Sequence, residues 1–484
     1  MHWIDLSIFI LYMVAMLSVG FYFMKRNKDT DDFFVGGRKM GSWHIGLSVV
    51  ATDVGGGFSI GLGGLGFMMG LAGSWMLFTG LIGAWLSAVF LIPKVFKLSA
   101  KHKFYTFPEI FRHFYGKEVA ILAGLISAIG YMGFTSSQIL AGAKLAAASF
   151  VNLDMQTALI VMGVITIVYT VMGGLKAVIY TDTIQWILLI SGLILIGIPL
   201  SYFTLGGSEV IMNSLPKEFF SLQNVSWQTI VNWAVTIIPI WFVGMTLYQR
   251  IYATRSEKQA RKAWFIAGIF EWPLMAFMGV MLGLFSRVAL QEGFFEYLGY
   301  DVLSDIDPEM GLPLLLRTIL PVGLMGLMMS AYFSAIMSTA DSCLMASSGN
   351  VLTDILQRFT TLPKGKKILR LSQALTLTIG VLALLLATTM QNVLELMLYS
   401  YAFMVSGLFV PILAAIYTRR PNQLAAFLAM LLGGGTTITL IIAEWDLPLS
   451  LDANIFGIST SALTYLMVSA VTSGGKMPAK TVEK

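Results

Sequence analysis

Long apolar runs recur from one end of the chain to the other. A run of about 20 apolar residues crosses the hydrocarbon core of a bilayer as a helix, which satisfies its own backbone hydrogen bonds there. Hydrophobic residues make up 57% and charged residues 12% of the 484 positions, so we predict an all-α polytopic membrane protein. About 13 spans are expected, near residues 4–24, 42–70, 74–96, 119–150, 157–174, 179–203, 228–249, 263–288, 320–348, 369–389, 391–418, 423–444 and 454–474.

The basic residues predict how the chain is oriented. With the N-terminus outside, nearly all lysines and arginines fall on the cytoplasmic side, as the positive-inside rule requires. One exception is Lys144, which we expect to extend toward the outer interface. The chain is thus predicted to be a multi-pass protein of the cell (plasma or inner) membrane, with its C-terminus in the cytoplasm. The net charge of +5 then reflects topology rather than nucleic-acid binding, and the single Cys343 excludes an intramolecular disulfide.

The second predicted span has an unusual composition. Residues 51–70 contain eight glycines and a carboxylate, Asp53. Glycine disfavours the helix by about 1 kcal/mol relative to alanine, so three consecutive glycines at 55–57 predict a break. Backbone breaks at membrane depth only where protein, water or ligand satisfies the freed groups, and a buried ionisable residue is typical of a functional site. We interpret the break as a binding site; the alternative is close helix packing beside a protonated Asp53.

A second interruption is expected in the seventh span, where Pro239 is followed by Trp241 and Gly244. Interrupted helices in corresponding positions indicate an inverted repeat with the substrate at the midplane. We therefore predict a LeuT-like 5+5 inverted-repeat core with discontinuous helices. The single transmembrane domain (1–484) would comprise an extra N-terminal helix and loop (1–40), the first repeat (41–203), the second repeat (204–420), and two extra helices with a short tail (421–484).

The ninth span carries oxygen-bearing side chains deep in an apolar helix. Ser338, Asp341 and Ser342 share one face by their i, i+3, i+4 spacing, and Thr339 is adjacent. Sodium is a hard cation that prefers hydroxyl, carbonyl and carboxylate oxygens. The alternative is that these hydroxyls bond back to carbonyls of their own helix, which would leave Asp341 without a partner.

Other polar residues lie within predicted spans. The fourth span presents Tyr131, Ser136, Ser137 and Gln138 on a face expected to point into the bundle. Asp182 and Gln185 share a face near the start of the sixth span, where Asp182 either serves a cation site or faces the helix dipole. Glu271 and Glu395 are intramembrane acids for which the sequence supplies no partner.

Several segments resemble the sodium/solute symporter family over about residues 31–420. Residues 32–38 read D-x-F-x-G-G-R, residues 106–109 read T-F-P-E, and residues 173–185 read G-G-x-x-A-V-x-x-T-D-x-x-Q. Residues 337–339, Met-Ser-Thr, are similar to that family's M-S-[ST] helix. The resemblance extends to the bacterial sodium/proline symporters and, in part, to the high-affinity choline transporter branch, which has an aromatic residue in place of Asp53.

The resemblance implies the residues of the site. Sodium ligands would be the carbonyls of Ala51 and Val54 and the hydroxyls of Ser338 and Thr339, with Asp182 close by. A second sodium ion would be bounded by Asp182, Ser338, Asp341 and Ser342. The residues expected at the substrate are Asp53, Gly56, Phe58, Tyr131, Gln138, Trp241 and Tyr399.

Together these observations predict a sodium-coupled symporter that imports a small polar organic solute by alternating access. Asp53 favours an amino acid or another zwitterion over a quaternary amine, which an aromatic would bind by cation–π attraction. Proton coupling, a choline-like, sugar or carboxylate substrate, a channel and a transporter-like sensor remain alternatives. No catalysis and no cofactor other than the coupling Na+ are expected, and the protein is expected to function as a monomer without nucleic acid.

Overall fold

The computed structural model describes residues 2–26, 36–53, 55–150, 153–172, 175–301, 305–360 and 366–473. This part of the chain is helical and has one isolated bridge, between Met40 and Thr254. The helices are α1 (Trp3–Arg26), α3 (Ser42–Asp53), α4 (Gly55–Met69), α5 (Trp75–Leu86), α6 (Ile92–His102), α7 (Pro108–Tyr115), α8 (Lys117–Ser149), α9 (Met155–Met172), α10 (Leu175–Gly192), α11 (Ile198–Thr204), α12 (Gly207–Ser214), α13 (Trp227–Val243), α14 (Met245–Ala253), α15 (Glu257–Ile269), α16 (Phe277–Gln291), α17 (Pro308–Ile319), α18 (Leu324–Gly349), α19 (Gln357–Phe359), α20 (Lys366–Ala387), α21 (Val393–Tyr417), α22 (Gln423–Ala443) and α23 (Ala453–Ser473).

Short 3₁₀ and π segments connect or widen these helices. The 3₁₀ turns are η1 (Gly36–Arg38), η2 (Gly70–Ser74), η5 (Lys217–Phe220), η7 (Glu296–Leu298) and η9 (Pro448–Ser450). The π segments are η3 (Ser87–Leu91), η4 (Leu193–Gly197), η6 (Phe270–Ala276) and η8 (Asn350–Leu356). π segments inside α-helices are frequent at functional sites, and η6 contains the intramembrane acid Glu271.

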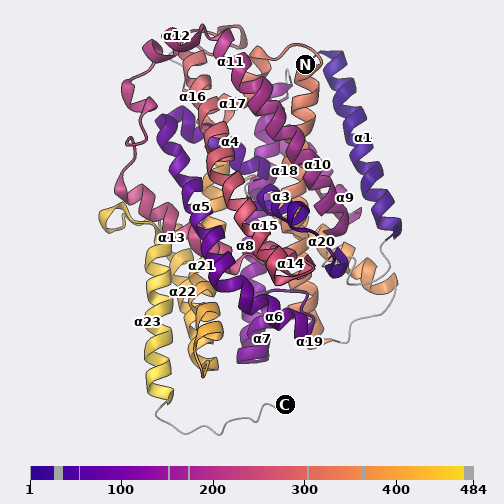
Figure 1. Cartoon of the computed structure of the whole chain (residues 1–484), viewed down its shortest axis with the longest axis vertical. Coiled ribbons are helices and arrows are strands. Elements are labelled where there is room, and N and C mark those ends of the chain that lie inside the picture. Colours follow the sequence, from indigo (N-terminus) through magenta and orange to yellow (C-terminus); the bar gives the residue numbers. More distant parts are fainter. Residues whose placement is uncertain are drawn as a thin grey trace.

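The helices form one elongated bundle (Figure 1). Within the described residues, eight helical runs are long and apolar enough to cross a membrane, and the bent pair α13–α14 makes a ninth. Each predicted span coincides with a helix or with consecutive helices, which confirms the all-α membrane class. The number thirteen stays a prediction. Of the family-like segments, residues 32–35 and 173–174 lie outside the described residues.

The predicted glycine break lies between α3 and α4. Gly55 starts α4 with φ +46°, a left-handed conformation that glycine adopts without a Cβ penalty. A Cβ at this position would lie 2.3 Å from Oγ1 of Thr339 on α18. Glycine is therefore required both by the backbone turn and by the close approach of α18, and the break is held against that helix.

The second break differs in detail from its prediction. Pro239 lies inside α13, which continues to Val243. The chain is extended at Gly244 (φ −65°, ψ 112°), and α13 and α14 meet there at 43°. The interruption thus falls at Gly244, because its extended ψ ends the helix, whereas the proline is accommodated within it.

The helix α18 organises the interior of the bundle. It packs against α8, α1, α10, α4, α9 and α3, and nearly all of its residues are buried. Its small and hydroxyl side chains allow the neighbouring backbones to approach closely, which is how helices associate within a bilayer. As a result, the oxygen-bearing positions of α18 face the broken α3–α4 pair on one side and α10 on another.

Lys144, near the end of α8, is not extended toward an interface as predicted. It is buried, and its Nζ lies 2.6 Å from Asp307 Oδ2 and 2.6 Å from Glu309 Oε2. Glu309 also accepts hydrogen bonds from the backbone N–H groups of Val393 (2.8 Å) and Leu394 (2.9 Å). Two acids compensate the lysine charge, so burial is favoured, and the N-terminus of α21 is tied to α17 and α8.

Candidate cation and solute site

The broken helix and α18 are joined by the hydroxyl of Thr339. Its Oγ1 donates a hydrogen bond of 2.8 Å to the carbonyl of Ala51, in the last turn of α3. The same hydroxyl lies 3.2 Å from the carbonyl of Ala335, one turn earlier in its own helix. The structure therefore places two predicted sodium ligands, Ala51 and Thr339, in direct contact. A third predicted ligand, the carbonyl of Val54, lies outside the described residues.

Asp182 of α10 is fully buried beside this contact. Its carboxylate accepts hydrogen bonds from Ser338 Oγ and, at 2.6 Å, from Ser48 Oγ. The helices α10, α18 and α3 thus meet at one carboxylate. Because a buried charge is costly unless it is both paired and hydrogen-bonded, this arrangement needs a positive group nearby.

That positive group is Arg250 of α14, whose Nη2 lies 3.5 Å from Asp182 Oδ2. Its guanidinium also donates to Ser48 Oγ (3.1 Å), Thr52 Oγ1 (2.5 Å), Ser342 Oγ (3.1 Å) and the Thr246 carbonyl (3.1 Å). The sequence places Arg250 among the cytoplasmic basic residues, but its side chain is fully buried. Arg250 therefore supplies the positive charge that compensates the buried Asp182 carboxylate.

The four residues predicted for a second sodium ion are not equally close together. Asp182 and Ser338 are hydrogen-bonded, and Ser342 is linked to Asp182 through Arg250. Asp341 instead accepts a hydrogen bond from Thr170 of α9, and the described residues include no ion pair to it. The structure thus divides this set into a linked group and a separate acid between α18 and α9.

Asp53, the last residue of α3, is buried and accepts a hydrogen bond of 3.1 Å from the hydroxyl of Tyr401 on α21. Gln138 of α8 accepts one of 3.1 Å from the backbone N–H of Gly57, one of the amides near the break. A Cβ on Gly57 would lie 2.4 Å from Gln138 Nε2. The predicted residues Asp53 and Gln138 therefore both lie at the break, and Gln138 bonds to one of its backbone amides.

Other predicted substrate residues are more widely spread. Tyr131 of α8 is hydrogen-bonded to the Thr246 hydroxyl (3.0 Å) at the start of α14. The Trp241 ring is buried against Trp264, with ring centroids 6.3 Å apart. Gly56 lies in α4 beside Gly57, and the side chain of Phe58 lies outside the described set.

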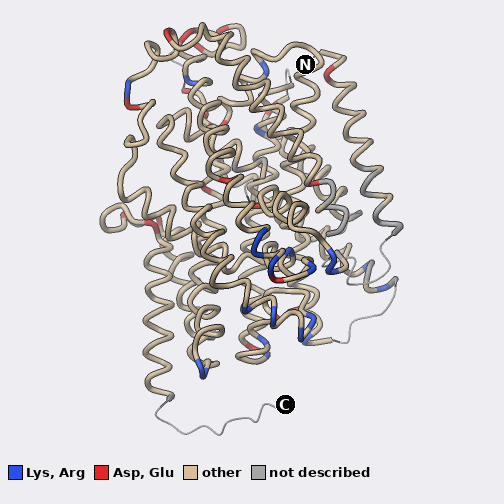
Figure 2. Tube along the Cα trace, in the orientation of Figure 1, with Lys and Arg blue, Asp and Glu red and all other residues tan. Residues whose placement is uncertain are grey.

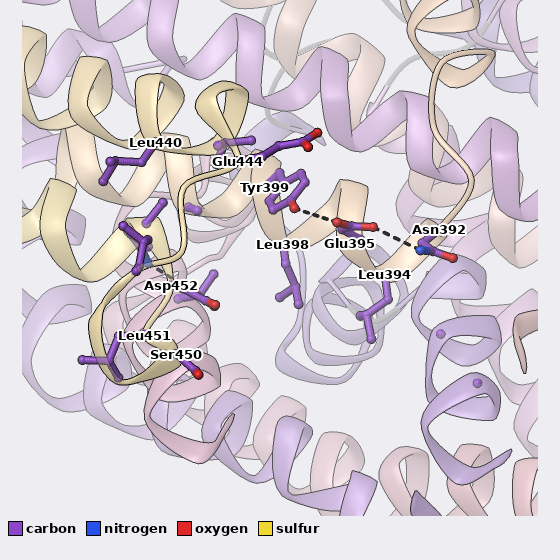
Figure 3. A pocket seen from close by; sticks show the side chains of 18 of the residues that line it. Asn392, Leu394, Glu395, Leu398, Tyr399, Leu440, Glu444, Ser450, Leu451 and Asp452 are labelled. Atoms are coloured by element: carbon purple, nitrogen blue, oxygen red, sulfur yellow. Dashed lines mark hydrogen bonds between the residues drawn. The ribbon is translucent and has the colours of Figure 1, made fainter. Parts of the chain in front are cut away.

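Tyr399 faces away from Asp53. It is 36% exposed, and its hydroxyl donates 2.6 Å to Glu395 Oε1 on its own helix. Both residues line a cavity of about 1010 Å³, which we call the α21 cavity. Figure 3 shows Tyr399, Glu395 and Asn392 in one hydrogen-bonded row along its wall. Tyr401, two positions later, is the tyrosine that contacts Asp53, because residues two apart lie on different faces of a helix.

This arrangement defines a class of protein. One membrane helix is broken at a buried carboxylate, hydroxyls of a second helix contact it, and a bent helix pair lies beside it. Secondary transporters with discontinuous helices have this architecture. The model of the sodium:solute symporter family matches residues 33–433. The chain belongs to this family, as its sequence predicts.

Known relatives agree with this assignment. The chain is 26% identical over 469 residues to the high-affinity proline transporter PutP of Bacillus subtilis (strain 168), covering 94% of this chain and 96% of that one. It is also 26% identical to sodium/glucose cotransporter 1 of Ovis aries, covering 91% and 72%. A solved Na+-coupled sialic acid symporter, 24% identical, superposes with a TM-score of 0.79 over 99% of both chains. These comparisons confirm the LeuT-like fold, and the relatives differ in substrate.

Proposed function

We propose that this protein is a sodium-coupled symporter that imports a small polar organic solute by alternating access. The observation that carries the proposal is the contact between Thr339 Oγ1 and the Ala51 carbonyl, with Asp182 and Ser338 beside it. This contact brings hydroxyl and carbonyl oxygens of two helices together at a backbone break, and such oxygens are the ligands sodium prefers.

Sodium binding would act on the contacts that join the helices. An ion held between the broken helix and α18 would replace the Thr339–Ala51 hydrogen bond with bonds from both oxygens to the metal. An ion beside Asp182 would compete with Arg250, since one carboxylate compensates one monovalent cation. Release of Arg250 would free α14 from Ser48, Thr52 and Ser342 together. Binding beside Asp182 would thereby be coupled to movement of the bent pair.

We infer that the N-terminus is outside and the C-terminus is cytoplasmic. Figure 2 supports this orientation: most lysines and arginines lie in the lower half of the view, and acidic residues gather near the N-terminal end and in the loop between α22 and α23. We also propose that residues 41–203 and 204–420 are the two repeats of the single domain, since each range contains one of the two breaks.

The membrane potential sets the energy available for transport. One sodium ion entering across 100 mV releases about 2.3 kcal/mol, which supports roughly a fifty-fold solute gradient.

A sodium titration of the purified protein tests the proposal. Sodium should raise the thermal denaturation midpoint relative to potassium at equal ionic strength, because a ligand that binds only the folded state stabilises it. Ser338→Ala with Thr339→Ala should weaken the apparent sodium affinity by roughly tenfold or more, the effect of losing two ligands of about 1 kcal/mol each.

Ser330→Ala is the matched control, because Ser330 lies on the same helix and bonds to the carbonyl of Gly326 one turn away. A sodium response that is equal in the control and in the double variant would contradict the assignment.

Proton coupling is a second candidate, favoured by Asp341. This acid is buried and bonded to Thr170, and the described part of the chain places no basic side chain in an ion pair with it. A buried acid without a cation is stable when protonated. Solute uptake in sodium-free vesicles under an inward proton gradient would support this candidate, and uptake that requires sodium at every pH would exclude it.

A further inference from the structure

An apolar groove of about 200 Å³ lies where α1, α8, α9 and α18 pack together. Figure 1 shows α1 at the margin of the bundle, so the groove belongs to the part of the molecule that borders the bilayer. The remaining wall is the segment between α8 and α9. Every described lining residue is apolar: Phe9, Leu145, Ala146, Phe150, Leu153, Ala158, Val161, Met162, Ile165, Met329 and Phe333.

The groove opens toward the hydrocarbon of the bilayer. Val161 of α9 is part of its lining and is nevertheless 44% exposed. Ile160 of α9 and Ile10 of α1 are also exposed, and exposed apolar side chains of membrane helices contact lipid. On the inner side, a Cβ at Gly142 of α8 would lie 2.8 Å from Cε of Met162. The absence of a side chain at Gly142 thus provides the space for the inner wall.

The chemistry of the groove selects its occupant. An ordered water needs about two to four polar partners, and the described lining side chains offer none. The apolar material available at membrane depth is the acyl chain of a lipid. The volume of about 200 Å³ is smaller than the roughly 300–1000 Å³ of pockets that enclose drug-sized ligands. The groove therefore fits a segment of one flexible chain rather than a rigid ring system such as a sterol.

A basic side chain lies beside one end of the groove. Arg317, in the last turn of α17, donates a hydrogen bond of 2.8 Å from Nη1 to the carbonyl of Ala148, two residues before Phe150 of the lining. Its side chain is half-buried, and it forms no ion pair with an acid in the described part of the chain. The carboxylate of Asp154, between α8 and α9, instead accepts a hydrogen bond of 2.9 Å from the backbone N–H of Thr157. The charge of Arg317 is thus available to an anion from outside the protein.

We propose that this groove is a binding site for an anionic phospholipid, with one acyl chain in the groove and the phosphate on Arg317. A guanidinium group presents a planar fork that binds two phosphate oxygens at once, and basic side chains between membrane helices bind lipid head groups. The groove supplies the apolar contact and Arg317 supplies the charge, so both parts of the lipid are recognised. The lipid belongs to the leaflet on the side of the N-terminus.

The bound lipid would strengthen the attachment of α1 to α18. These helices already touch at the rings of Phe9 and Phe333, whose centroids lie 5.5 Å apart and which both line the groove. Asp5 of α1 also accepts hydrogen bonds from the backbone N–H groups of Gly323 (2.7 Å) and Gly326 (2.9 Å), where α18 begins. An acyl chain in the groove contacts both helices and fills the space between them and α9.

Native mass spectrometry and thermal denaturation of the delipidated full-length protein in a neutral detergent test the proposal. The probes are dioleoylphosphatidylglycerol, dioleoylphosphatidylcholine, oleate and cholesterol, which separate an anionic phospholipid from a zwitterionic one, a single chain and a sterol. We expect phosphatidylglycerol to be retained by the protein and to raise the melting midpoint most, because a ligand that binds only the folded state stabilises it. An equal or larger shift with any of the other probes would overturn the proposal.

Substitutions of Arg317 test the head-group contact. Arg317→Gln should lower the apparent affinity for phosphatidylglycerol by roughly tenfold or more, the effect of losing one charge-assisted hydrogen bond, and should remove its advantage over phosphatidylcholine. Arg317→Lys keeps the charge and should retain part of that advantage. Arg287→Gln is the control, because the Arg287 guanidinium lies over the ring of Phe67, 4.9 Å from its centroid, and does not line the groove. A wild-type preference for phosphatidylglycerol in Arg317→Gln would refute the head-group contact.

Val161→Trp tests the groove itself. The larger side chain at this exposed position covers the mouth, so the shift with phosphatidylglycerol should disappear. Ile160→Trp is the control, because Ile160 is exposed on the same helix and does not line the groove. Each variant is compared with and without lipid, so a change in its own stability does not enter the result. Normal lipid binding by Val161→Trp would place the lipid elsewhere, and a dimer that only this variant loses would assign the groove to a second copy of the chain; either result overturns the proposal.

Discussion

Replacing Gly55 by alanine should separate the broken helix from α18. The alanine Cβ would lie 2.3 Å from Thr339 Oγ1, whereas unstrained heavy atoms approach to about 3.5 Å. The threonine hydroxyl must therefore move by roughly 1 Å, which breaks its 2.8 Å bond to the Ala51 carbonyl. A lost buried hydrogen bond costs about 1 kcal/mol, and a non-glycine residue at φ +46° costs a further ~1–2 kcal/mol.

The combined destabilisation of about 2–3 kcal/mol should be accompanied by weaker sodium binding, because the same two oxygens are the proposed ligands. Thermal denaturation with and without sodium measures both effects. Gly435→Ala is the control: Gly435 lies in α22 and an added Cβ would contact nothing within 4 Å. If Gly55→Ala matches this control in stability and in sodium response, the close approach of the break to Thr339 has no role in cation binding.

Two further substitutions test buried charges. Arg250→Met should destabilise the sodium-free protein by about 3 kcal/mol, because Asp182 is left unpaired, and saturating sodium should restore part of that stability. Arg255→Met, at an exposed site, is the control. A loss of stability that sodium does not change would argue against competition between sodium and Arg250 at Asp182. Glu309→Gln should lower stability by about 2 kcal/mol, because its bonds to Lys144 and to the α21 amides become weaker. The control is Glu296→Gln, at an exposed site. Equal melting midpoints of these two variants would show that Asp307 alone is enough to stabilise the buried Lys144.

The sequence was sufficient to predict the features that follow from local composition. The bilayer requires long apolar helices, so each span could be located from hydropathy. The glycine break was predictable because glycine and the freed backbone groups have strong and known preferences. The contact of Thr339 with Ala51 agrees with what the family resemblance implies, since α18 packs against α3.

The features that sequence reasoning missed depend on how distant helices pack. Tyr399 and Tyr401 lie two positions apart in one predicted span, and only the rotation of α21 decides that Tyr401 faces Asp53. Arg250 follows a predicted span and reads as a cytoplasmic charge, but the bend at Gly244 returns α14 to the interior.

Direct binding of radioactive sodium to the purified protein is the most decisive measurement. The account predicts saturable binding of ²²Na+ to the wild-type protein, competed by unlabelled sodium and not by potassium, and strongly reduced in the Ser338→Ala, Thr339→Ala variant while Ser330→Ala binds normally. Saturable sodium binding that is unchanged in the double variant, or no saturable binding in the wild-type protein, would contradict the claim that the broken helix and α18 hold the coupling ion.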